Sequence, residues 1–104
     1  MKKLLVCLGF AAALPQAAWA DGWVGRFVPT GTYVSGLQNY HFRVFGIPAS
    51  AGCTNEFAYV SGDDPALKAF TATLLMTVAM NKPVNLYVTK DSAGFCRIIE
   101  LDTR

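Results

Sequence analysis

Three side chains in this sequence could together hold a ligand: His41, Arg43 and Tyr87. His41 and Arg43 lie in the alternating stretch 38–47, and Tyr87 lies in the alternating stretch 84–90. In both stretches the alternation points these side chains away from the apolar face. A cation, a switchable donor and a flat ring are groups that can stack on and hydrogen-bond a sugar. All three are candidate ligand-binding residues if the two stretches lie close together; the alternative is an ordinary solvated strand face.

No comparable arrangement suggests an enzyme. The serines lie in Gly-rich turns, where hydroxyl groups cap the backbone: Ser35, Ser50, Ser61 and Ser92. No spacing of a nucleophile and a base, and no phosphate-binding loop, is visible in the sequence. Asp63 and Asp64 are explained by the capping of the helix that follows them. We therefore predict a protein that is not an enzyme and uses no cofactor.

The first twenty residues have the pattern of a secretory signal peptide. Lys2 and Lys3 provide a positive start, the run LLVCLGFAAAL is apolar, and AWA is a small-x-small cleavage site. The apolar run is too short to span a bilayer, which disfavours a membrane anchor. We expect cleavage after Ala20 and export to the periplasm or out of the cell. Residues 21–104 contain no repeat or linker and are expected to form one domain.

The charge of the exported part is balanced. Lys2 and Lys3 leave with the signal peptide, so that seven of the nine basic residues remain against seven acidic ones. A neutral chain lacks the positive field that attracts nucleic acids or anionic membranes. We therefore expect no nucleic-acid partner and no membrane insertion.

Two cysteines, Cys53 and Cys96, remain in the exported part of the chain. In a small exported domain two cysteines most often form a disulfide. Closing such a long loop stabilises the fold by about 4 kcal/mol in the chain-entropy description. The alternative is a redox or metal site, but the spacing is not C-x-x-C and two cysteines with one histidine are few ligands for zinc. We expect the disulfide and no metal site.

Periodicity predicts a mainly β domain with one helix, which is an α+β fold. The expected strands are 22–36, 38–47, 54–60, 84–90 and 95–101, and the expected helix is 65–80. Pro29 and Gly31 interrupt the first strand, which predicts an edge, a bulge or two short pieces. The order β-β-β-α-β-β is typical of a small five-stranded antiparallel barrel of the oligonucleotide/oligosaccharide-binding (OB) type. A split sheet with a packed helix is the alternative topology.

The helix is predicted with both ends defined. Asp64 is a suitable N-cap before Pro65, and Asn81 can take the left-handed conformation that ends a helix. At 100° per residue one face carries large apolar side chains suited to a core: Leu67, Phe70, Leu74 and Val78. The opposite face is also apolar, but its residues are small or flexible: Ala69, Ala72, Met76, Ala79 and Met80.

A helix that is apolar on all sides is usually buried on all sides. A single chain of this size has no second layer for the opposite face, so we predict a homo-oligomer in which the helices pack together. Cover by a loop of the same chain is the alternative.

The helix and the strand after it resemble the pentameric B subunits of bacterial A–B toxins, of the subtilase-cytotoxin and typhoid-toxin type. The likeness is carried by Phe70, Leu74 and Ala79, by KPVNLYV at 82–88, and more loosely by DGWVG at 21–25. The resemblance implies an OB barrel, a pentamer around a helix-lined pore, binding of cell-surface sialoglycans and a toxin A-subunit partner.

The sequence departs from that family at its sugar site. The family's serine early in the first strand corresponds to Gly25, and the tyrosine at the end of its PV-x-x-Y-Y run corresponds to Val88. Of that site only the preceding tyrosine is matched, by Tyr87. Two other functions stay open: a monomeric periplasmic inhibitor or partner-binding protein that uses the loop 46–52, and a nucleic-acid-binding OB domain, which the neutral charge disfavours.

Overall fold

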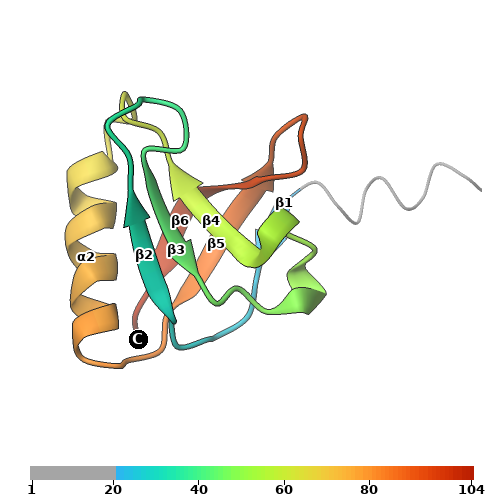
Figure 1. Ribbon diagram of the computed structural model, residues 1–104. Coiled ribbons are helices and arrows are strands. Elements are labelled where there is room, and N and C mark those ends of the chain that lie inside the picture. Colours follow the sequence, from blue (N-terminus) through green and yellow to red (C-terminus); the bar gives the residue numbers. More distant parts are fainter. Residues whose placement is uncertain (1–20) are drawn as a thin grey trace, which may run out of the picture.

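The computed structural model describes residues 21–104, and the predicted signal peptide lies outside the described residues. Residues 21–104 form six strands and one α-helix (Figure 1). The strands are β1 (Asp21–Trp23), β2 (Gly31–Val34), β3 (Phe42–Phe45), β4 (Phe57–Val60), β5 (Asn85–Lys90) and β6 (Cys96–Asp102). The helix is α2 (Leu67–Ala79), and two short 3₁₀ turns, η2 (Ala49–Ala51) and η3 (Thr54–Glu56), precede β4. No helix in residues 21–104 has the length and hydropathy needed to cross a membrane.

The strands form one mixed sheet in the order β1-β5-β6-β4-β3-β2. The predicted α+β class is confirmed. The predicted first strand is divided into two short pieces, β1 and β2, so that residues 21–104 contain six strands rather than five. The prediction of wholly antiparallel pairing is wrong, because β4 and β6 are parallel with Ala58 opposite Cys96. The parallel pair arises because α2 and β5 carry the chain back before β6 begins, so that β6 runs in the same direction as β4.

The sixth strand comes from the interrupted first stretch. Gly25 has a φ of 95°, which a side chain would disfavour, and Pro29 has no N–H to donate to a strand ladder. Before the interruption, β1 pairs with β5. After it, β2 pairs with β3. A single bridge between Phe27 and Val84 lies between the two strands, so one continuous stretch supplies both ends of the ladder.

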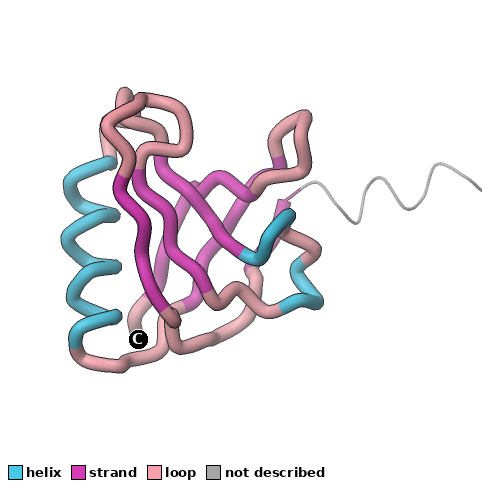
Figure 2. The backbone as a smooth tube through the Cα atoms, viewed as in Figure 1, coloured by secondary structure: helices cyan, strands magenta, loops and turns pink. Residues whose placement is uncertain are grey.

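The core lies on the inner face of the sheet. Its largest fully buried side chains are Phe42, Ile47, Leu74, Leu86, Ile98, Val44, Val60 and Val84. Leu74 comes from α2, which packs beside β2 at one end of the ladder (Figure 2). Leu67 and Phe70 are partly buried against the same core, as their predicted helix face requires. Thr77 is also buried, and its hydroxyl group is satisfied by donating to the carbonyl of Leu74 at 2.8 Å.

Both ends of α2 depend on local sequence. The α-helix starts at Leu67, two residues later than predicted, so its N-cap is Ala66 and the prediction of Asp64 as N-cap is wrong. The carboxylate of Asp64 instead accepts the N–H of Ala66 at 2.8 Å. At the other end, Asn81 adopts a φ of 56°. The N–H of Lys82 then donates to the carbonyl of Thr77 at 2.9 Å. This is a left-handed helix end of the Schellman type, in which otherwise unpaired carbonyls are satisfied.

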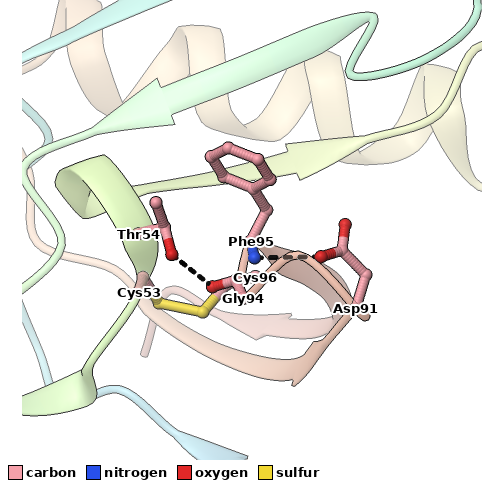
Figure 3. Close-up of a disulfide and its surroundings, with 6 residues drawn as sticks. All are labelled: Cys53, Thr54, Asp91, Gly94, Phe95 and Cys96. Atoms are coloured by element: carbon pink, nitrogen blue, oxygen red, sulfur yellow. Dashed lines mark hydrogen bonds between the residues drawn. A yellow bond between two sulfur atoms is a disulfide. The ribbon is translucent and has the colours of Figure 1, made fainter.

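The predicted disulfide between Cys53 and Cys96 is present, with 5.4 Å between the Cα atoms (Figure 3). It ties the loop before β4 to the start of β6, and Cys96 is fully buried. Next to it, the hydroxyl of Thr54 donates to the carbonyl of Gly94 at 3.0 Å. A buried disulfide is consistent with an oxidising location outside the cytoplasm.

Candidate functional site

Strand β4 is buried on both of its faces. Ala58 and Val60 point into the core, whereas Phe57 and Tyr59 point outward and are nevertheless only 5% and 6% exposed. Their cover is a second apolar group on the outer face of the sheet, which we call the aromatic cluster. Its members are Tyr33, Tyr40, Phe45, Phe57, Tyr59 and Phe95. Because these rings pack closely on the outer face of β4, they can hold neighbouring side chains in fixed positions.

The rings of the aromatic cluster contact one another in a chain. Tyr40 packs edge-on against Tyr59 and Phe95, with ring centroids 4.5 and 5.2 Å apart. Phe57 stacks on Phe95 at 5.3 Å and contacts Phe45 at 5.4 Å. Edge-to-face and stacked pairs at these distances are favourable beyond the area that they bury. The cluster therefore joins β3 and β4 to the turn between β5 and β6.

Asp91 anchors the aromatic cluster through both carboxylate oxygens. Oδ1 accepts the N–H of Phe95 at 3.0 Å (Figure 3). It also accepts the N–H of Ala93 at 3.0 Å, and the two bonds fix the turn between β5 and β6. Oδ2 accepts the hydroxyl of Tyr59 at 2.9 Å and that of Tyr40 at 3.2 Å. The carboxylate is thus fully occupied within the protein, and its role is to position these groups.

The pKa values of these groups follow from their contacts. Partial desolvation by itself raises the pKa of Asp91, but the four hydrogen bonds that its carboxylate accepts outweigh it and hold the pKa below the ordinary value of 3.8. Burial, together with the hydrogen bond to Asp91, raises the pKa of Tyr59 far above the ordinary value of 10.0. The pKa of Tyr40 is raised for the same reasons. The network is therefore built for an ionised carboxylate and two neutral tyrosines.

Tyr40 has a backbone conformation that is unusual for a bulky residue, with a φ of 53°. Such a conformation costs on the order of 1 kcal/mol or more and persists only where its surroundings impose it. Here the ring packs in the aromatic cluster and the hydroxyl is held by Asp91. The result is that the carbonyl of Tyr40 faces Arg43 and accepts its Nε–H at 3.0 Å.

Arg43 lies against the aromatic cluster and is partly buried. Its guanidinium carbon is 4.4 Å from the centroid of the Tyr33 ring and 5.5 Å from that of Phe57. The cation–π attraction of an arginine to such rings is worth about 0.5–2 kcal/mol. In residues 21–104 the one salt bridge joins Asp102 to Arg104, so that no carboxylate of this part pairs with Arg43.

The structure does not bring the three predicted ligand-binding residues together. Arg43 lies in β3 and Tyr87 in β5, and the strands β4 and β6 lie between them in the ladder. His41 is near Arg43 along the chain, and its Nδ1 is 3.1 Å from the carbonyl oxygen of Leu37. Alternation placed all three side chains on an outer face, but it carries no information about strand order. The ligand-binding role of each residue stays a prediction.

Tyr87 has a different aromatic partner, which the sequence pattern did not identify. Trp23 lies opposite it in β1, with ring centroids 5.3 Å apart in an edge-to-face arrangement. Trp23 is 49% exposed, so the pair presents a large ring to solvent. Beside it is a hollow of about 250 Å³ whose polar lining includes Asp21, Ser50 and Lys90. This second surface, the Trp23–Tyr87 pair with the adjoining hollow, has the groups that a small polar ligand requires.

Comparison with known proteins gives no relative for this chain. No protein-family model, no curated protein and no solved structure matches it. In the part of the chain that the structure describes, no group of three or more His, Cys, Asp or Glu side chains is placed to hold a metal ion. The features that bear on function are therefore the two aromatic surfaces and the exposed apolar side chains of α2.

Proposed function

We propose that this chain is an exported, non-enzymatic binding module of the toxin B-subunit type and that it acts as a homo-oligomer, with a pentamer favoured. The observation that carries the proposal is the exposed apolar face of α2. Met76 and Met80 are each 55% exposed, and Leu75 is exposed beside them. Ala69, Ala72 and Ala79 are also exposed and extend this face along the helix. A contiguous apolar helix face marks an interaction surface more often than an isolated exposed side chain does.

The composition of this face suits the packing of one helix on another. Alanine lets two backbones approach closely, and methionine adapts its shape to an irregular partner. Lys68 is the one charged residue between Leu67 and Ala79. A face of this kind loses little on desolvation, because it contains few charges to remove from water. A second copy of the same helix provides a matching surface.

The pairing of the first stretch supports the proposed OB-like barrel. Residues 21–34 are continuous in the chain, yet β1 pairs with β5 at one end of the ladder and β2 pairs with β3 at the other. If β1 and β2 count as one kinked strand, the ladder returns to its starting strand and becomes a five-stranded barrel. Glycine and a break in the ladder at such a kink are common means of bending a strand around a barrel.

We place glycan binding at the Trp23–Tyr87 pair and the adjoining hollow. An exposed indole offers a flat apolar face for a sugar ring, while Ser50, Lys90 and Asp21 provide donors and acceptors for its hydroxyl groups. This site retains Tyr87 from the predicted ligand-binding residues. The proposed ligand is a cell-surface glycan, and a toxin A subunit is the proposed protein partner of the oligomer.

A monomeric inhibitor or partner-binding protein is the second candidate. It is favoured by Leu37, which is 72% exposed at the turn between β2 and β3. A protruding apolar side chain on a turn can insert into a pocket of another protein.

The two candidates differ in mass, which light scattering on the exported, oxidised protein measures. A stable assembly of several copies at micromolar concentration supports the B-subunit proposal. A monomer contradicts it and leaves the inhibitor. A glycan array with the parent protein and Trp23→Ala then tests the ligand, and loss of every glycan signal in the variant is the expected result. If the variant retains the parental pattern, the glycan site is not at Trp23.

A further inference from the structure

We propose that Arg43 and Tyr33 form a second binding site, for an oxyanion such as a carboxylate or phosphate that is attached to a flat apolar group. The site lies on β2 and β3, whereas the proposed glycan site lies on β1 and β5, and in the ladder β4 and β6 lie between β3 and β5. It goes beyond the proposed function, because neither the oligomer nor the glycan site requires it.

The first observation is a charge without a counter-ion. Arg43 is partly buried, and none of the carboxylates in residues 21–104 lies within salt-bridge distance of it. Asp91, the carboxylate that anchors the aromatic cluster, uses both of its oxygens on backbone N–H groups and tyrosine hydroxyls. A cation that is partly removed from water gains most from an anion that supplies charge and hydrogen bonds together.

Arg97 is the second arginine in this row of the sheet. Tyr59 lies opposite Arg43 in β4, and Arg97 lies opposite Tyr59 in β6, so that two strand spacings separate the two arginines. Salt screens most of the field of one arginine at the other over such a distance. Asp91 is held by its hydrogen bonds to Tyr40, to Tyr59 and to the turn between β5 and β6. The positive charge that an incoming oxyanion meets is therefore that of Arg43.

The second observation is that the guanidinium is already oriented. Its Nε–H donates to the carbonyl of Tyr40, and its plane is held over the ring of Tyr33. Among residues 21–104 its two terminal nitrogens donate no hydrogen bond, and neither is a buried unsatisfied atom, so that both are open to solvent. A fixed fork of two free N–H groups matches the two oxygens of a carboxylate or phosphate. The strained backbone of Tyr40 is the means by which this orientation is imposed.

The third observation concerns the body of the ligand. Tyr33 is 50% exposed although it lies directly beside Arg43. The exposed part of Tyr33 offers an apolar surface next to the guanidinium, whose carbon is 4.4 Å from the ring centroid. An anion that carries a planar group can contact both residues at once, whereas a bare anion contacts only Arg43. The expected ligand class is therefore a small aromatic or planar acid.

The test is a set of NMR titrations of the exported protein in which the Arg43 Nε–Hε signal and the Tyr33 ring signals are followed. The probes are benzoate, phenyl phosphate, acetate, inorganic phosphate and benzyl alcohol. We expect saturable chemical-shift changes with benzoate and phenyl phosphate. Acetate and inorganic phosphate should bind at least about tenfold more weakly, and benzyl alcohol should cause no saturable change. The ratio of benzoate to phenyl phosphate affinity distinguishes a carboxylate ligand from a phosphate ligand.

Variants separate this site from a general effect of charge. Arg43→Gln should lose at least about tenfold in affinity for benzoate, and Tyr33→Ala should reduce benzoate to the affinity of acetate. Arg97→Gln is the matched control, because it removes an arginine from the same row, and it should stay within about twofold of the parent. Equal losses in Arg43→Gln and Arg97→Gln, or no saturable shift at Arg43 in the parent protein, would overturn the proposal. The parent titration decides even if Arg43→Gln does not fold.

Discussion

The hydroxyl of Tyr59 donates to Oδ2 of Asp91 at 2.9 Å and so links the outer face of β4 to the turn between β5 and β6. The two residues are 32 positions apart in the sequence. The same oxygen accepts the hydroxyl of Tyr40 from the turn between β2 and β3. One carboxylate thus holds three separate segments together, and the position of Arg43 depends on all of them.

The first prediction concerns the loss of folding stability at low pH. The pKa of Asp91 is lowered in the folded protein, so the folded state favours the ionised form. Its stabilising contribution is therefore complete above the ordinary pKa of 3.8 and is lost as the pH falls through the lower folded value. Urea unfolding from pH 6 downward should show a steeper loss of stability below about pH 4 in the parent than in Asp91→Asn. Equal slopes for the two proteins would contradict this role of Asp91.

The second prediction concerns folding stability at high pH. The pKa values of Tyr59 and Tyr40 are raised, so their contribution is complete below the ordinary value of 10.0 and declines as the pH rises through the folded values. Tyr59→Phe removes one of the two hydroxyl groups and should destabilise the protein at neutral pH by about 1–2 kcal/mol. The difference between parent and variant should shrink above pH 10. A difference that stays constant from pH 7 to the alkaline limit of folding is the opposing result.

The third prediction concerns the disulfide between Cys53 and Cys96. The two cysteines are separated by 43 positions in the sequence, and reduction opens the loop that their disulfide closes. This should lower the free energy of unfolding by about 2–4 kcal/mol. The expected fall in melting temperature is several degrees or more and is measured by circular dichroism with and without reductant. The double variant Cys53→Ser, Cys96→Ser is the control and should be insensitive to reductant. Two thiols that react freely in the native, unreduced protein would refute the disulfide.

The parts of this structure that the sequence predicted are those decided locally or by a single strong constraint. Asn81 ends α2 because the left-handed turn needs one tolerant residue at one position. Asp64 was predicted as the N-cap, but it bonds the N–H of Ala66, which is itself the N-cap of α2. The pairing of Cys53 with Cys96 followed from there being two cysteines in residues 21–104.

The parts that the sequence did not predict depend on strand order and on distant contacts. Tyr87 was grouped with Arg43 because both point outward, yet two strands separate them. The bond from Tyr40 to Asp91 spans 51 positions and has no local signal. One sequence feature could have suggested the aromatic cluster: Phe57 and Tyr59 lie on the same face of one strand. The alternation predicted this shared face but not the side chains that cover it.

The fourth prediction concerns the proposed glycan site. Tyr87→Ala removes the ring that supports Trp23 and should weaken glycan binding while the fold persists, because Tyr87 is only partly buried. His41→Ala is a suitable control, since His41 lies at the start of β3 and away from that pair. Binding is measured on the glycan array and folding by near-ultraviolet circular dichroism. Unchanged binding in a folded Tyr87→Ala protein would remove this residue from the site.

The last prediction concerns the outer face of α2. If Met76 faces a neighbouring copy of the helix, a charge placed there has to leave water on assembly, and in a ring it lies near identical charges from the other copies. An unpaired charge that is buried in this way costs several kcal/mol, so Met76→Glu should yield monomers. The fold should persist, because Met76 is 55% exposed in the single chain.

Leu74→Ala should have the converse effect, because Leu74 is fully buried in the core. This variant should lose about 2–5 kcal/mol of folding stability, while the molecules that remain folded should keep the mass of the parent. Ser92→Glu, in the exposed turn between β5 and β6, controls for the added charge and should leave the mass unchanged. Light scattering on the three variants and the parent measures the outcome: if Met76→Glu keeps the mass of an oligomeric parent, the interface lies elsewhere on the domain.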